Sequence, residues 1–343
     1  MESSTPSSNV SDSPTDASSG QWISEETLFY WTRAMSITCF SLTFVLGILG
    51  NGLVIWITGF QMRKTMTTTW FLNLGISDFS FCLFLPLYIT EAARWGNWPF
   101  GQIMCKVTYF TTGLNQCASL LFLATISMDR CICVLYPIRS RSSRTATLAA
   151  IISVIIWLLS VALSFPYIFF TDIQNSNNFS VCFLTNGSLE NITTIHEEML
   201  SFSFPAIVIS DFVFTFLIPF PIILVCYGLI AFTVRKSKRI PESFRTLKII
   251  LTTVLCFFFC WVLYHVLPVI DIAGHYMPWP RKFFLYSLAE CLAFSNTCLN
   301  PIIYVFIARD FQQSLKKSIP FLLESTFKEK NDTPEVLEDN NVL

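Results

Sequence analysis

The sequence predicts an all-α membrane protein, a bundle of seven transmembrane helices with the N-terminus outside. Three observations support this fold class. Of the 343 residues, 53% are hydrophobic and only 13% are charged, against roughly 25% charged residues in soluble domains. Seven apolar runs reach the length of about 20 residues that a helix needs to cross the hydrocarbon core. Lys and Arg gather in the connections on one side of these runs.

The apolar runs are long and continuous, which favours helices, because the strands of a membrane barrel are short and alternate apolar with polar residues. Proline and charged residues precede the last two runs and mark turns between helices. The spanning helices are predicted at residues 34–60, 69–92, 103–136, 146–170, 204–234, 247–274 and 283–308.

The positive charges set the orientation. Six cations lie between Arg235 and Lys248, and further clusters lie in the other connections of the same side. An excess of Lys and Arg marks cytoplasmic loops, so the N-terminus is predicted to be extracellular and the chain to be a multi-pass plasma-membrane protein. Four N-x-S/T triplets on the outer side predict glycosylation at Asn9, Asn178, Asn186 and Asn191. The triplet at Asn331 lies in the predicted cytoplasmic tail, where it is expected to stay unmodified.

Four regions follow from this topology. Residues 1–33 are polar and Ser-rich, which is typical of a disordered extracellular tail and not of a cleavable signal. Residues 34–308 form the bundle. In residues 309–324, apolar side chains recur at helical spacing and predict a short amphipathic eighth helix that lies in the membrane surface on the cytoplasmic side. Residues 325–343 are predicted to be a disordered cytoplasmic tail.

Composition and motifs argue against several function classes. The formal net charge is -1, so the chain has no overall positive charge that would attract nucleic acid. The sequence has no Gly-rich phosphate loop, HExxH or CxxC motif, and we expect neither an enzyme nor an organic cofactor. A transporter or an intramembrane hydrolase would show internal repeats, interrupted helices or a nucleophile and base at membrane depth. None is evident in the sequence.

Most of the twelve cysteines lie within apolar runs, where a reduced, buried thiol is expected. Cys105 and Cys182 are different, because both fall on the predicted outer side. That setting is oxidising and favours a disulfide between them. Two free thiols are the alternative.

Motifs within the spans resemble those of class A (rhodopsin-like) G-protein-coupled receptors over nearly the whole chain. They are GILGNGLVIW, LNLGISD, DRC, IPFPIILVCY, FFFCW and NTCLNPIIY. Within that family, WPFGQIMCK, SMDRCICVLYPIRSRSSRT, NTCLNPIIYVFIARDF and ESTF resemble the chemoattractant group of formyl-peptide, chemerin and anaphylatoxin receptors.

The resemblance implies a cell-surface receptor for an extracellular peptide or lipid mediator, which activates a heterotrimeric G protein of the inhibitory class and drives chemotactic or inflammatory responses. Arrestin, receptor kinases and membrane lipid are further partners on this interpretation. The alternative is an atypical receptor that binds and internalises its ligand, or recruits arrestin, without G-protein coupling.

An ionisable side chain within the membrane is a functional-site hypothesis by default, and Asp78 is one. The resemblance implies that a sodium ion binds there as an allosteric ligand, with Asn51 among the polar residues gathered around the aspartate. The expected ion site comprises Asp78, Asn115, Ser119, Asn296 and Asn300. A protonated Asp78 hydrogen-bonded to amides is the simpler alternative.

The resemblance implies that five residues serve G-protein coupling and activation: Asp129, Arg130, Ile138, Tyr227 and Tyr304. Arg130 would meet the end of a G-protein helix in the active state, and the neighbouring Asp129 would neutralise it otherwise. The two tyrosines would brace the open state. Ile138 would insert into an apolar site on the G protein.

The sequence departs from the family pattern in two places. Leu263 stands where the family has a proline two residues after Trp261, and the nearest proline is Pro268. Proline is the usual cause of a sharp helix kink, so without it the sixth span is expected to bend less or at another position. This change therefore keeps the atypical receptor as an alternative. Ser243 stands where some relatives have an acid that binds the span-three arginine, and Glu242 is one position away.

The ligand pocket is predicted from acids in the outer parts of the spans. No acid lies between Lys106 and Asp129, so the aspartate with which amine receptors hold an ammonium group is missing. We expect a peptide with a basic or amino-terminal group to bind among six residues: Asp211, Glu290, Asp271, Glu91, Trp261 and His265. The alternative for Asp271 and Glu91 is that they face outer water.

Overall fold

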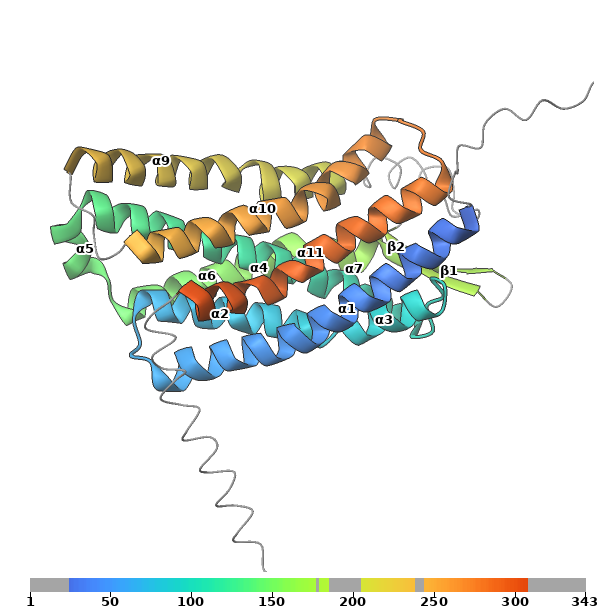
Figure 1. The fold of residues 1–343 in the computed structure, drawn as a ribbon, viewed down its shortest axis with the longest axis horizontal. Helices are drawn as coiled ribbons and strands as arrows, with labels where there is room; N and C mark the ends of the chain where they lie inside the picture. Colours follow the sequence, from blue (N-terminus) through green and yellow to red (C-terminus); the bar gives the residue numbers. More distant parts are fainter. Residues whose placement is uncertain (1–24, 177–178, 185–204, 238–243, 308–343) are drawn as a thin grey trace, which may run out of the picture.

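The computed structural model describes residues 25–176, 179–184, 205–237 and 244–307 (Figure 1). The described chain forms a bundle of long helices that lie side by side. The short helix α5 is at one end of the bundle, and the strands β1 and β2 are at the other. This arrangement matches the predicted fold class and separates an outer end from a cytoplasmic end.

The helices that build the bundle follow one another along the chain. In order they are α1 (Glu25–Trp56), α2 (Met66–Cys82), α3 (Leu85–Ala93), α4 (Gly101–Leu135), α5 (Pro137–Ser143), α6 (Ala146–Ser164), α7 (Pro166–Phe170), α9 (Pro219–Ser237), α10 (Phe244–Ile272) and α11 (Trp279–Ile307). Two turns are π-helical: η1 (Ile57–Gln61) ends the first span, and η2 (Val213–Leu217) lies within the fifth. Residues 205–212 are helical as well.

Six stretches of the described residues are long and apolar enough to cross a membrane. They are Glu25–Gln61, Met66–Ala93, Gly101–Leu135, Ala146–Phe170, Pro205–Thr233 and Val254–Ile272. The helix α11 is 29 residues long and packs against α1 and α10, so it completes the bundle as the seventh span. Asn296 and Asn300 of this helix are buried in the interior of the bundle.

The helix α4 runs through the centre of the bundle and contacts α2, α6, α9 and α10. Its inner neighbours form one continuous core with large buried side chains such as Trp70, Phe122, Phe257 and Phe294. Large apolar side chains on the outside, such as Phe259, are exposed and face the space that lipid fills. Burial inside the bundle therefore identifies the polar residues that act within the protein.

The first helix begins earlier than the predicted start of the span at residue 34. Helix α1 starts at Glu25, and two acids in its first turn stabilise the positive end of the helix. Phe29 contacts the ring of Phe283, and Tyr30 meets Trp95 edge to face. These contacts with other outer segments stabilise the helix beyond the apolar run. The prediction of a disordered tail at residues 1–33 is therefore wrong for residues 25–33.

The outer loop after α7 contains a β-hairpin that the all-α prediction did not include. Strand β1 (Thr171–Ser176) pairs antiparallel with β2 (Phe179–Leu184), and Asn175 lies opposite Ser180 in the register. The free edge of β2 is also paired, because Trp98 N donates a hydrogen bond to Ser180 O at 2.7 Å. The hairpin is thus fixed to the loop between α3 and α4.

Several predictions concern parts of the chain outside the described residues. The four glycosylation sites, the eighth helix at 309–324, the tail at 325–343 and the pair Glu242 and Ser243 belong to this group. They stay predictions.

Candidate functional site

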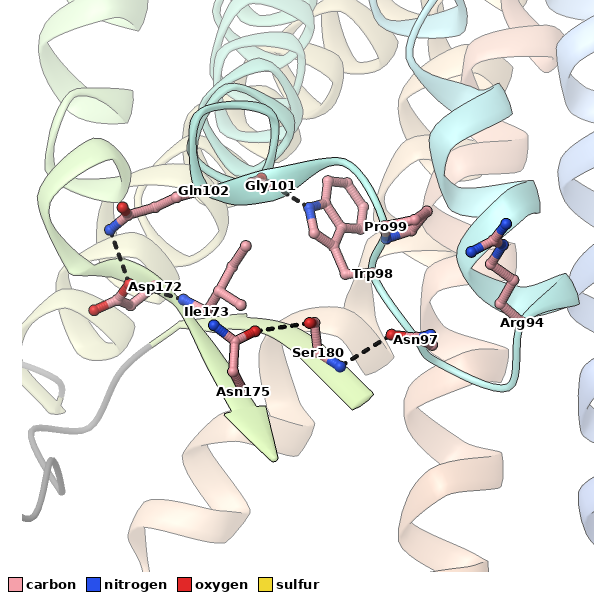
Figure 2. Close-up of a pocket in the computed structure, with 10 residues that line it drawn as sticks. All are labelled: Arg94, Asn97, Trp98, Pro99, Gly101, Gln102, Asp172, Ile173, Asn175 and Ser180. Atoms are coloured by element: carbon pink, nitrogen blue, oxygen red, sulfur yellow. Dashed lines mark hydrogen bonds between the residues drawn. The ribbon is translucent and has the colours of Figure 1, made fainter. Parts of the chain in front are cut away.

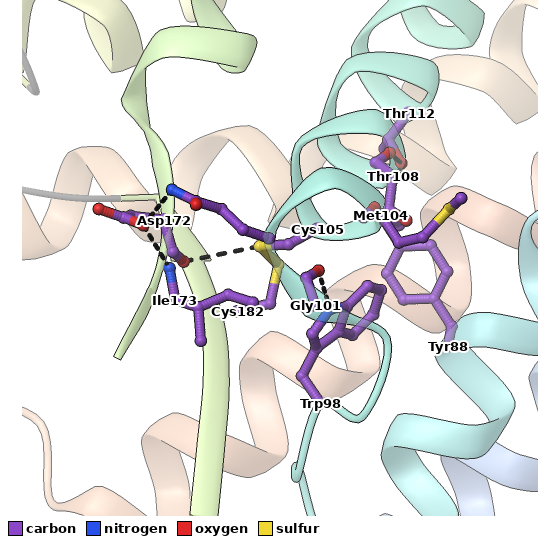
Figure 3. Close-up of a disulfide and its surroundings, with 11 residues drawn as sticks. Tyr88, Trp98, Gly101, Met104, Cys105, Thr108, Thr112, Asp172, Ile173 and Cys182 are labelled. Atoms are coloured by element: carbon purple, nitrogen blue, oxygen red, sulfur yellow. Dashed lines mark hydrogen bonds between the residues drawn. A yellow bond between two sulfur atoms is a disulfide. The ribbon is translucent and has the colours of Figure 1, made fainter. Parts of the chain in front are cut away.

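The outer entrance is fixed by a disulfide between Cys105 on α4 and Cys182 on β2 (Figure 3). Both cysteines are buried and form a cluster with Trp98, against which Phe100 and Ile173 pack. The bond joins residues separated by 77 positions. It therefore fastens the hairpin to the outer end of the central helix, beside the mouth of the bundle.

Below this entrance, a hydrogen-bonded network connects helices three, five and six. His265 Nδ1 lies 3.4 Å from Asp211 Oδ2, and His265 Nε2 lies 2.9 Å from Gln116 Nε2. The same amide nitrogen of Gln116 donates to Thr215 Oγ1, and that hydroxyl donates to the backbone oxygen of Asp211. Since Gln116 donates to Nε2, the neutral imidazole carries its proton on Nδ1, toward the carboxylate. Asp211 and His265 are thereby held in one geometry.

The π-helical turn η2 contributes to this arrangement. It includes Thr215 and follows Asp211 on the fifth span. Such turns rotate the residues that precede them relative to a regular helix and occur often at functional sites. On the sixth span, Trp261 is buried, and its ring lies 6.1 Å from that of His265. Trp261 therefore packs one turn from His265 on the same helix, and its role as the floor of the ligand pocket stays a prediction.

Glu91 and Glu290 form the other acidic part of the pocket. Their carboxyl groups interact electrostatically, and Glu290 also acts on the hydroxyl of Tyr264. Asp211 acts electrostatically on the same hydroxyl of Tyr264. In the described part of the chain, no Lys or Arg forms an ion pair with any of these three acids.

Asp271 is placed differently. Its carboxylate lies 2.8 Å from Lys282 Nζ and accepts a hydrogen bond from Tyr286. The contact joins the outer ends of α10 and α11, and Lys282 balances the charge of Asp271 within the chain. A role for Asp271 in ligand binding stays a prediction.

The polar centre of the bundle surrounds Asp78, which is fully buried. Asn115 Nδ2 and Ser119 Oγ donate to its Oδ1 at 2.9 and 3.1 Å, and Asn300 Nδ2 donates to its Oδ2 at 2.8 Å. Four of the five residues predicted for the ion site therefore meet. Asn115 also donates to Ser77, which the sequence reasoning did not include.

Asn296 and Asn51 differ from this group. Asn296 is buried in the same region, but within the described residues neither its Oδ1 nor that of Asn300 has a hydrogen-bond partner. Asn51 instead donates to the backbone oxygens of Gly47 and Thr297, so it joins helices one and seven. Two buried acceptor oxygens, one of them on a residue that binds Asp78, thus remain without a partner in the described chain.

At the cytoplasmic end of α4, Asp129 binds two arginines. Its Oδ2 lies 3.8 Å from Arg130 Nε and 3.0 Å from Arg144 Nη2. Both arginines also donate to the hydroxyl of Thr67 at the start of α2. The sequence reasoning paired Arg130 with Asp129 but counted Arg144 only as a cytoplasmic charge, since nothing in the local sequence indicates its partner.

The other predicted coupling residues lie near this cluster or beyond it. Tyr227 packs against the buried side chains of Cys131, Cys226 and Ile230 where α4 meets α9. Ile138 in α5 is 89% exposed, so its apolar side chain is available to a cytoplasmic partner. Tyr304 belongs to α11, but its side chain lies outside the described part of the structure.

The sequence reasoning also missed Gln116 and Thr215 in the pocket. Gln116 had a usable signal, because an amide within an otherwise apolar span requires a partner. Thr215 had none, since threonine is common in spanning helices and bonds its own backbone there.

Comparison with known proteins agrees with this geometry. Residues 50–304 match the family described as 7 transmembrane receptor (rhodopsin family). N-formyl peptide receptor 2 of Gorilla gorilla gorilla is 34% identical over 316 residues, which cover 88% of this chain and 89% of that receptor. Chemerin-like receptor 2 of Homo sapiens is 37% identical over 298 residues, covering 86% and 82%. Human N-formyl peptide receptor 2 is 35% identical over 320 residues, covering 88% of each chain. The chain therefore belongs to the rhodopsin family of G-protein-coupled receptors and to its chemoattractant group, whose members are plasma-membrane receptors and not enzymes.

Proposed function

We propose that this chemoattractant receptor recognises a peptide with a basic or amino-terminal group and activates a G protein of the inhibitory class. One observation carries the ligand proposal. Glu91, Asp211 and Glu290 come from three different spans, and no Lys or Arg of the described residues pairs with them. Acids without a cation at the outer end of a bundle favour a positively charged ligand.

The relatives suggest which ligands to test first. Their names refer to N-formyl peptides and to chemerin. An N-formyl group removes the amino-terminal charge, whereas the acids of this pocket favour a ligand that keeps a charge. We therefore expect basic peptides to be more potent than N-formylated peptides of the same sequence.

Replacing Asp211 with asparagine tests the proposal. The change removes the charge and preserves the size of the side chain. Truncating a buried, hydrogen-bonded charge pair costs about 2–5 kcal/mol, so the potency of a basic peptide is expected to fall by at least about tenfold. The assay is G-protein dissociation in transfected cells, with arrestin recruitment measured in parallel.

Asp271→Asn is the matched control, because Lys282 already balances that carboxylate. Its effect on potency should be smaller than that of Asp211→Asn. Equal potency of basic peptides on the wild type and on Asp211→Asn would contradict the ligand proposal. Arrestin recruitment without G-protein dissociation would favour the atypical receptor, for which the substitution at Leu263 is the motivating feature.

We further propose a sodium ion at Asp78 as an allosteric ligand. The residues fit such an ion, because hard cations prefer oxygen ligands and the Oδ1 atoms of Asn296 and Asn300 are buried without partners in the described chain. Replacing sodium chloride with choline chloride should lower the thermal stability of the wild type. Asp78→Asn should remove that difference, and a difference that persists in this variant would contradict the proposal.

A further inference from the structure

A pocket in the described part of the chain lies outside the membrane-spanning core, between the α3–α4 loop and the hairpin. It has a volume of about 450 Å³, within the range of roughly 300–1,000 Å³ that ligand sites occupy. Figure 2 shows Arg94 on one side of this outer pocket and Asp172 on the other. Its lining is mostly polar, and only some of the polar groups have hydrogen-bond partners in the described chain.

Two asparagines are oriented by Ser180. The backbone nitrogen of Ser180 donates to Asn97 Oδ1 at 2.9 Å, and its hydroxyl donates to Asn175 Oδ1 at 2.7 Å. Each amide thus uses its oxygen on Ser180, which leaves both NH₂ groups as donors. Among the described residues, neither NH₂ group has an acceptor. Both asparagines line the pocket.

The charges of the pocket are satisfied unequally. Asp172 Oδ1 accepts hydrogen bonds from Gln102 Nε2 at 3.0 Å and from Ile173 N at 2.8 Å, so this carboxylate is already engaged. The guanidinium of Arg94 has no partner in the described chain. The nearby Arg33 is different, because it donates to Ala93 O and lies 4.3 Å from the centre of the Trp95 ring. The side-chain groups of Arg94, Asn97 and Asn175 that lack a partner in the described chain are therefore donors, while Asp172 keeps its charge and is engaged by two neutral donors.

We propose that this outer pocket binds an acidic side chain of the peptide ligand, with Arg94 and Asn97 as its main donors. A guanidinium and an amide NH₂ group bind a carboxylate through charge-assisted hydrogen bonds. The inference rests on the proposed function and deepens it. The ligand is dipolar, with a basic group among the acids of the deep pocket and an acid at the outer one.

Direct binding tests the outer pocket without a known agonist. The probes are tetra-aspartate and tetra-lysine peptides that carry an uncharged fluorophore, and binding to the full-length receptor in phosphatidylcholine nanodiscs is followed by fluorescence anisotropy. Arg94→Gln removes the charge. It should weaken tetra-aspartate binding about fivefold, the upper value for an exposed ion pair. Arg94→Glu should abolish tetra-aspartate binding and strengthen tetra-lysine binding.

Asn97→Asp is a second, nearly isosteric variant. It preserves the acceptor for Ser180 N and replaces the NH₂ donor with an oxygen, so the hairpin contact stays and tetra-aspartate binding should fall at least about fivefold. Arg281→Gln is the matched control, because it removes an exposed outer arginine away from the pocket. Screening should limit its effect to less than about twofold. Thermal unfolding of each variant shows that the fold is retained.

Three results would overturn the outer-pocket proposal. They are no saturable binding of tetra-aspartate by the wild type, unchanged binding by both Arg94→Gln and Asn97→Asp, and an equal loss in Arg281→Gln. None of them bears on the deep pocket. If basic peptides still depend on Asp211 in the dissociation assay, the proposed function stands while the outer pocket fails. If Asp211→Asn has no effect while the Arg94 variants behave as expected, the outer pocket is supported and the proposed ligand site at Asp211 fails.

Discussion

Replacing Arg144 with glutamine should raise the activity of the receptor in the absence of ligand. Arg144 Nη2 lies 3.0 Å from Asp129 Oδ2 and 3.1 Å from Thr67 Oγ1, so it links the connection after α5 to the ends of α4 and α2. The same acid and hydroxyl hold Arg130. Removing Arg144 takes away the shorter of the two ion pairs that keep this cluster closed.

The size of the effect follows from the contacts. A hydrogen bond to a charged group contributes about 1.5–3 kcal/mol. Arg144 is 30% exposed, and Arg130 remains 3.8 Å from the acid and can replace part of the loss. A net change of about 1 kcal/mol shifts a two-state equilibrium about fivefold. The population of a rarely populated active state rises in proportion to the equilibrium constant. Basal G-protein dissociation should therefore increase about fivefold in Arg144→Gln.

The assay is basal G-protein dissociation in transfected cells at equal surface expression. Asp129→Asn should give a larger increase, since it releases both arginines. Arg63→Gln is the control, because it removes an exposed cytoplasmic arginine outside the cluster and should leave basal activity unchanged. If Arg144→Gln matches the wild type while Asp129→Asn is raised, Arg144 does not restrain the receptor. A rise of equal size in Arg63→Gln would attribute the effect to net charge alone.

Two further predictions concern stability. A Cβ atom at Gly113 would lie 2.8 Å from the ring of Tyr167, whereas one at Gly228 would have no neighbour within 4 Å. Gly113→Ala should therefore lower thermal stability by about 1–3 kcal/mol through overpacking, and Gly228→Ala should not. Equal unfolding temperatures of the two variants would contradict this. Replacing Cys105 or Cys182 with serine should destabilise the outer end by about 2–5 kcal/mol. Surface expression should fall equally in either single variant and in the double variant, and an additive fall would show that the two thiols act separately.

The local sequence was sufficient for the spans, their orientation and the residues of the central polar site. Apolar length is a property of consecutive residues, so seven spans were predicted from the apolar runs alone. Six of them are long and apolar enough to cross a membrane among the described helices, and α11 forms the seventh. Asp78 was identified because a carboxylate within lipid requires partners. The motifs around it indicated Asn115, Ser119 and Asn300, which the structure brings to its oxygens.

Other features depend on how distant segments meet. Asp271 resembled a ligand acid in the sequence, yet the approach of α11 places Lys282 against it. Arg144 appeared as one of many cytoplasmic cations, and only the position of its loop reveals the contact with Asp129. The outer hairpin and its pocket have no hydropathy signal, because they lie in water and are fixed by a disulfide and by hydrogen bonds to another loop.

The sequence by itself determined that this chain is a membrane bundle with a polar centre and a cytoplasmic arginine, because the length and composition of each span are local quantities. Only the tertiary structure decided which charges remain unpaired. Helix rotation and loop conformation place Asp271 and Asp129 beside cations of the chain, and they leave Glu290 and Arg94 without a partner in the described residues. Charge pairing depends on distances between residues far apart in the sequence, and these distances exist only in the folded chain.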